Sequence, residues 1–96
     1  MPPISGKVKK AVEKLVRESL ARYGVKVLAI EPAIDSIGED IIRITLQYGN
    51  DDAPLAIPTL NKLVRDTFAV LDTLNEPSYP MYTHNFNVGR KFVDAE

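Results

Sequence analysis

The sequence predicts an α+β fold: a two-layer sandwich in which two helices cover one face of a three-stranded sheet, in the order helix-strand-strand-helix-strand. Two observations predict it. The segment Glu39–Tyr48 alternates apolar and mainly polar residues, the two-residue period of a β-strand with one buried face. The flanking segments, residues 5–23 and 58–74, repeat apolar residues at helical spacing, so they need a sheet to pack against.

The chain has 96 residues, the size of a single domain with one core. We expect the core to extend over residues 5–87 and residues 88–96 to form a tail. The formal net charge is −1, cysteine is absent, and there is no apolar run of about 18 residues and no basic-then-apolar leader. These features favour a soluble cytoplasmic protein without a cofactor, a metal ion or a membrane partner.

The first helix is expected to begin after Ser5, whose side chain can cap the first turn, and to end near Tyr23, where Gly24 closes it. One side of this helix carries apolar residues and faces the core. The opposite side carries basic residues within an arc of roughly 80°. These basic residues are Lys7, Lys10, Lys14 and Arg17.

Val25–Ile30 is expected to form the first strand, and Pro32 to end regular pairing or to mark an edge or a bulge. The turn residues of Asp35–Gly38 then lead into the central strand, so the first two strands should form an antiparallel hairpin.

The second helix should begin near Pro58 or Thr59 and stop before Pro77. Its core-facing stripe consists of Leu60, Leu63, Val64, Thr67, Phe68, Leu71 and Leu74. Met81–Phe86 is expected to be the third strand. A right-handed crossover makes it parallel to the second strand, either beside it or beyond the first strand.

Catalytic and metal chemistry has little support in the residue spacing. His84 is the single histidine, and we expect an ordinary strand residue rather than a metal ligand or a relay. The spacing of the acidic turn residues does not match an EF-hand loop, so solvated turns are expected. These acidic residues are Asp35, Glu39, Asp40, Asp51 and Asp52.

The uncovered sheet face predicts self-association. With both helices on the face of Ile44, strand parity places apolar residues on the other face, and such patches usually mark an interface. A homodimer through the sheet is therefore expected, with a tail that folds Phe92 and Val93 over the sheet as the alternative. The expected interface residues are Leu28, Ile30, Ile41 and Thr45.

The element order, together with Pro80-Met81-Tyr82 and then Phe86 in the last strand, resembles the type II KH layout of ribosome-binding factor A. That resemblance implies RNA as a partner, although the Gly-x-x-Gly clamp of typical KH modules is absent from this sequence. The Asp35–Asp40 turn before the alternating strand also resembles short bacterial proteins with no assigned role.

The leading hypothesis is a small non-catalytic interaction protein, homodimeric or bound to an unidentified protein partner. An RNA- or ribosome-associated module that uses the basic first helix is the second hypothesis. An enzyme or metal binder that uses the acidic loops is the third.

Overall fold

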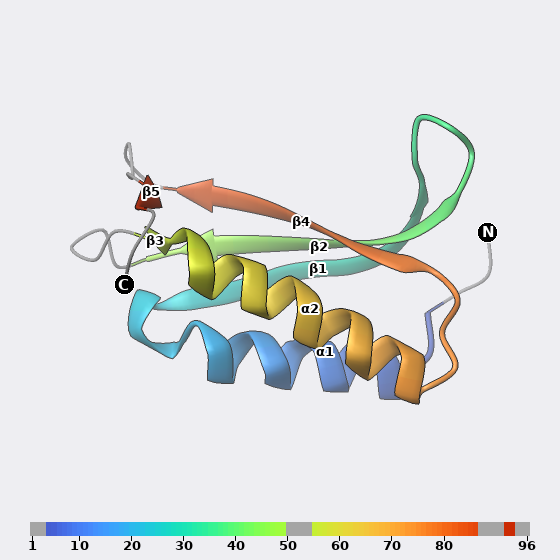
Figure 1. Cartoon of the computed structure of the whole chain (residues 1–96), viewed down its shortest axis with the longest axis horizontal. Helices are drawn as coiled ribbons and strands as arrows, with labels where there is room; N and C mark the ends of the chain where they lie inside the picture. Colours follow the sequence, from blue (N-terminus) through green and yellow to red (C-terminus); the bar gives the residue numbers. More distant parts are fainter. Residues whose placement is uncertain (1–3, 50–54, 87–91, 94–96) are drawn as a thin grey trace.

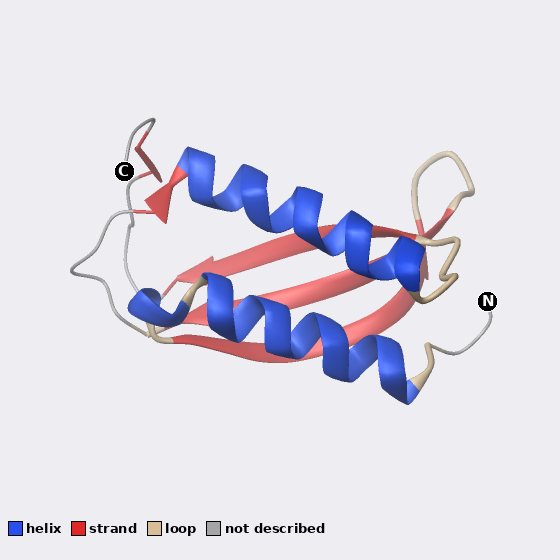
Figure 2. Cartoon of the chain, turned by 60° about the horizontal axis from the view of Figure 1, so that its bottom comes forward, coloured by secondary structure: helices blue, strands red, loops and turns tan. Residues whose placement is uncertain are grey.

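The computed structural model describes residues 4–49, 55–86 and 92–93. It has the expected α+β architecture, with two helices on one face of a three-stranded sheet (Figure 1). Figure 2 shows the helices side by side, both running along the length of the sheet. The opposite sheet face carries no helix in the described part of the chain.

The first helix, α1, spans Gly6–Ser19. Ser5 caps it as expected, because its Oγ accepts a hydrogen bond of 3.2 Å from the amide of Val8. The α-helix ends earlier than the predicted Tyr23, since a 3-10 turn, η1, takes over at Ala21–Tyr23. Gly24 then reverses the chain with φ 61° and ψ 39°, the left-handed conformation that favours glycine.

The strands β1, Val25–Ile34, and β2, Asp40–Tyr48, form the predicted antiparallel hairpin. β1 extends four residues past Ile30 because Pro32 is accommodated in the ladder, opposite Ile42. β1 is an edge strand, where a missing N–H on the outer side costs no ladder hydrogen bond.

A β-bulge in β1 reverses the strand parity that the sequence suggested. The register shifts between Val27, which lies opposite Leu46, and Ala29, which lies opposite Thr45. Ile30 consequently lies opposite Ile44 and packs against the core. The expectation that Ile30 lies on the uncovered face is wrong, because one extra residue moves every following side chain to the other face.

The crossover from β2 runs through the short strand β3, Leu55–Ala56, and the second helix α2, Ile57–Thr73, to strand β4, Tyr79–Phe86. β4 is parallel to β2 and lies beside it, so the sheet order is β1-β2-β4. This settles the strand order that the sequence left open. β5, Phe92–Val93, pairs in parallel with β3 as a separate two-stranded sheet.

The core lies between the sheet and the two helices, as expected from the alternation in β2. Ile42, Ile44 and Leu46 are each 0% exposed and face the helices. The helices contribute their inward-facing residues, which are Val8, Val12, Val16 and Leu20 from the first helical segment and Leu63 and Leu71 from α2.

Candidate functional site

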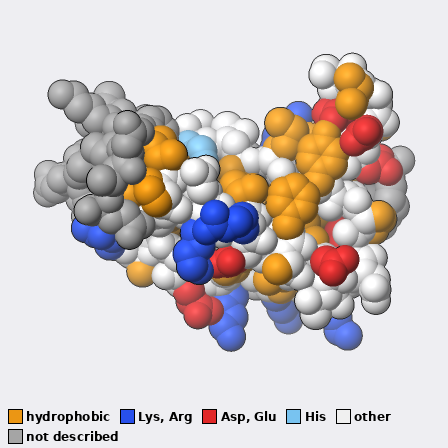
Figure 3. Space-filling model, viewed as in Figure 1, with side chains coloured by type: hydrophobic (Ala, Val, Ile, Leu, Met, Phe, Trp, Pro, Cys, Tyr) orange, Lys and Arg blue, Asp and Glu red, His pale blue; other side chains and the backbone are white. Residues whose placement is uncertain are grey.

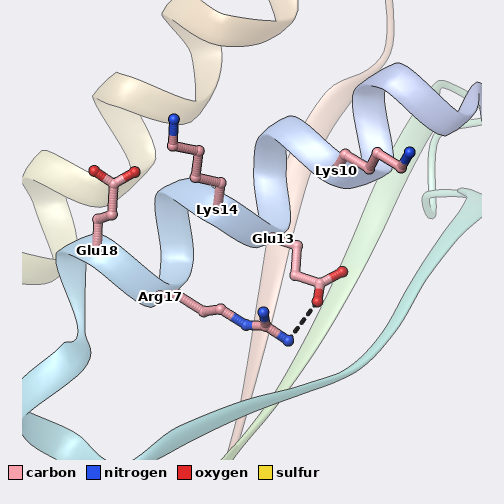
Figure 4. Close-up of a pocket in the computed structure, with 5 residues that line it drawn as sticks. All are labelled: Lys10, Glu13, Lys14, Arg17 and Glu18. Atoms are coloured by element: carbon pink, nitrogen blue, oxygen red, sulfur yellow. Dashed lines mark ion pairs between the residues drawn. The ribbon is translucent and has the colours of Figure 1, made fainter.

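The basic face predicted on the first helix is present on α1. Lys7, Lys10, Lys14 and Arg17 are all exposed to solvent. Figure 4 shows three of them on the outer surface of α1, beside a shallow depression of about 620 Å³. Five side chains of one helix line this depression, so it is a surface rather than an enclosing pocket.

Acidic residues interrupt the basic face. Glu13 forms an ion pair of 2.6 Å with Arg17, four residues further along the helix (Figure 4). Glu18 also lines the depression, on the side of Lys14. Among the described residues, Lys7, Lys10 and Lys14 make no ion pair. Within the basic face, the positive charge open to a partner is therefore carried by these three lysines.

The acidic hairpin has a structural role through Asp35. Its Oδ1 accepts hydrogen bonds from the amides of Ile37, at 3.0 Å, and Glu39, at 2.8 Å. Its Oδ2 accepts a hydrogen bond from the hydroxyl of Tyr79, at the start of β4. Asp35 thus closes the turn and ties the hairpin to the far edge of the sheet.

No group of three potential metal ligands comes together within residues 4–49, 55–86 and 92–93. Asp51 and Asp52, the second half of the hypothetical acidic site, lie outside the described residues.

His84 belongs to a polar and aromatic cluster between the sheet and the helices. Its Nδ1 lies 2.7 Å from the hydroxyl of Tyr48, and its ring stacks on that of Tyr82 with 6.1 Å between centroids. The Tyr82 hydroxyl in turn lies 2.7 Å from Oγ1 of Thr67 in α2. Burial lowers the pKa of His84 and raises the pKa of Tyr82 to about 12. Both groups are therefore neutral near pH 7, and the cluster fastens α2 to β4.

The uncovered sheet face differs from the predicted apolar patch. Thr45 is partly buried there, and Leu28, which is 56% exposed, lies at the bulge of the edge strand, where it lines a depression together with Lys9 and Glu13 of α1. Ile41, in contrast, is only 2% exposed, because it lies at the base of the hairpin, which rises on this side of the sheet (Figure 1). With Ile30 on the helix side, two of the four expected interface residues are not available on this face.

A different surface carries exposed apolar side chains, at the edge formed by β4 and α2. Met81 of β4 is 47% exposed, and Val64 and Phe68 of α2 are 37% and 48% exposed. Figure 3 faces this edge and shows hydrophobic side chains gathered over both elements. Met81 pairs with Arg43 on the helix-free face, whereas its neighbour Tyr82 contacts Thr67 of α2, so Met81 lies on the other side of the strand from α2. We call Val64 and Phe68 the edge cluster.

The apolar spacing of α2 predicts core positions for Val64 and Phe68, and this prediction is wrong because both side chains are exposed. The width of the predicted apolar stripe indicates this exposure. The stripe spans about 140° of α2, which is wider than the arc that a helix buries against a single sheet. The residues at one margin of such a wide stripe remain exposed.

Comparisons with protein-family models, with curated proteins and with solved structures found no match to this chain. Neither α1 nor α2 combines the length and apolar character that a membrane-crossing helix needs, and these are the two α-helices in the described residues.

Proposed function

We propose that this protein is a small, non-catalytic interaction protein of the cytoplasm that acts as a homodimer. The observation that carries the proposal is the edge cluster, two apolar side chains of α2 that are exposed beside the β4 edge, together with Met81, which is exposed on the other face of β4. Exposed apolar side chains beside a strand edge that has no partner within the described residues are typical of a protein interface. A twofold dimer is the most frequent arrangement that covers such a surface.

The size of the chain supports the same proposal. A domain near 96 residues buries roughly 60–70% of its extended-chain surface, so its stability margin is small. Burial of the edge cluster against a second copy adds apolar contact that the isolated chain lacks.

Sedimentation equilibrium of the full chain across a hundredfold range of concentration tests this proposal. We expect a mass of twice 10.7 kDa that falls toward the monomer value on dilution. A monomer mass at every concentration would reject the homodimer.

RNA or ribosome association through α1 is a second candidate function. It is favoured by the three exposed lysines that make no ion pair within the described residues, and by the likeness of the element order to type II KH modules. A gel shift with structured RNA at two salt concentrations tests it. Binding should weaken with salt and be lost when Lys7, Lys10 and Lys14 are replaced by alanine, whereas Lys26→Ala on β1 serves as the matched control.

A further inference from the structure

The two edges of the sheet differ in their protection against pairing. β1 contains a bulge, a proline and the charged residues Lys26 and Glu31, which are devices that discourage association at a strand edge. β4 also contains a proline, Pro80 next to its first residue, but it pairs with β2 without a register shift over all eight residues from Tyr79 to Phe86 and contains no Lys, Arg, Asp or Glu. Its outer side has no strand partner among the described residues.

The edge cluster extends this surface from the strand to the helix. One flank of α2 faces α1, since Ala69, Val70 and Thr73 line a cavity of about 260 Å³ together with Ala11 of α1. Thr67 points to the sheet, where it contacts Tyr82. At 100° per residue, Val64 and Phe68 lie on the remaining flank, away from α1 and above the β4 edge.

We propose that a second copy of this chain docks on the β4 edge, with the two β4 strands antiparallel about a twofold axis and the two α2 helices in contact through Val64 and Phe68. This inference rests on the proposed homodimer and names its interface. The paired strands would form one continuous six-stranded sheet, with all four long helices on the same face. Pairing between edge strands in this way satisfies the outer backbone groups of both copies.

A single axis position satisfies both the strands and the helices. The midpoint of β4 lies between Tyr82 and Thr83, and the hydrogen bond from Tyr82 to Thr67 places Thr67 and Phe68 at that same level. An axis through the middle of β4 therefore also brings the two copies of Phe68 together. Because β4 contains no Lys, Arg, Asp or Glu, the two paired β4 strands bring no like charges together.

The charges of α2 are self-complementary about this axis. Arg65 precedes Phe68 by three residues and Asp72 follows it by four, and both are exposed on the outer side of the helix. Since the two α2 helices run antiparallel in the dimer, Arg65 of one copy lies opposite the partner's Asp72, and the pair occurs twice. This complementarity favours a second copy over an unrelated partner, because an unrelated strand would not supply the opposite charges in this order.

Charge reversal tests the arrangement at low salt. Arg65→Glu and Asp72→Arg should each weaken dimerisation roughly tenfold, because each places like charges opposite one another twice. The double variant R65E/D72R should recover the wild-type dimer, and an equimolar mixture of the two single variants should dimerise better than either alone. Lys14→Glu on α1 is the matched reversal away from the interface and should have no effect.

Phe68→Lys supplies an independent disruption at an exposed site, and it should give a monomer with an unchanged circular dichroism spectrum. A wild-type dimer that none of these variants affects, or one that the double variant fails to restore, would overturn the β4 interface while leaving the homodimer intact. A wild-type monomer would reject both proposals, so the two failures are distinguishable by the mass of the unmodified chain.

Discussion

The hydroxyl of Tyr82 donates a hydrogen bond of 2.7 Å to Oγ1 of Thr67. The direction follows from the second bond of Thr67, whose own hydroxyl proton goes to the carbonyl oxygen of Leu63 at 2.6 Å. Thr67 is 0% exposed, so this contact fixes the position of α2 above β4 in the interior. The same contact determines which part of β4 lies beside the edge cluster on α2.

Replacing Thr67 by valine should destabilise the protein by about 1–3 kcal/mol, because the Tyr82 hydroxyl loses its acceptor in a buried site. Tyr82→Phe should cost only about 0.5–1.5 kcal/mol, since Thr67 keeps its bond to Leu63. Urea unfolding of both single variants and the double variant measures the coupling. Thr83→Val, a change at an exposed position of the same strand, is the control. Equal losses of unfolding free energy in Thr67→Val, Tyr82→Phe and Thr83→Val would contradict the assigned hydrogen bond.

Alkaline unfolding should report Tyr82. Burial raises its pKa from 10.0 to about 12 in the folded protein. Between these values the unfolded chain loses the phenolic proton while the folded chain retains it. The contribution of Tyr82 to the free energy of unfolding is therefore complete below pH 10 and is lost as pH rises toward 12. Thermal melts from pH 9 to 12 should therefore fall more steeply for the wild type than for Tyr82→Phe. Parallel curves would show that the phenol is not shielded.

The two faces of β2 should differ in their contribution to stability. Ile44 is 0% exposed between the sheet and the helices, so Ile44→Ala should cost about 2–5 kcal/mol and leave much of the protein unfolded or insoluble. Thr45 lies on the uncovered face and is only partly buried, so Thr45→Ala should cost far less. Equal losses in denaturant unfolding would mean that the uncovered face is itself buried, for instance in a dimer.

The sequence predicts the elements of this fold well because their signals are local. Alternation in β2 and the apolar spacing of α1 are visible within ten to twenty residues, and the basic face of α1 follows from helical spacing alone. Exposed positions of a helix need no knowledge of its neighbours. Helical spacing therefore predicts the exposed positions of the four basic residues on α1, which are Lys7, Lys10, Lys14 and Arg17.

The features that the sequence hides are those that depend on the partner element. The bulge at Leu28 lies within an ordinary apolar run, and it becomes visible only when β2 supplies the register. The contact of Asp35 with Tyr79 joins residues 44 positions apart. The edge cluster required the strand order β1-β2-β4, which leaves β4 at the edge and Val64 and Phe68 without cover from α1.

The corrected parity of β1 gives a direct mutational test. Ile30 packs against the core on the helix side, so Ile30→Ala should destabilise the protein by about 1–3 kcal/mol. Leu28, which is 56% exposed at the bulge, should tolerate Leu28→Ala within about 0.5 kcal/mol. Urea midpoints of the two variants decide the question. A larger loss for Leu28 than for Ile30 would restore the regular strand that the sequence suggested.

Mild acid should destabilise the protein through His84, because burial holds the pKa of this imidazole below its ordinary 6.5. As pH falls, the unfolded chain takes up a proton near pH 6.5 before the folded chain does, so unfolding is favoured. The contribution of neutral His84 to the free energy of unfolding is thus complete above pH 6.5 and is lost as pH falls through the pKa of the folded state.

The window between pH 7.5 and 5.5 isolates this group, since His84 is the single histidine and most carboxyl groups titrate lower. Urea midpoints of the wild type should fall across this window, whereas those of His84→Gln should remain nearly constant, although lower at pH 7.5 because the contact with Tyr48 at 2.7 Å changes. A wild-type midpoint that rose on acidification would mean that the folded protein stabilises the imidazolium, which contradicts the burial of His84 against the rings of Tyr48 and Tyr82.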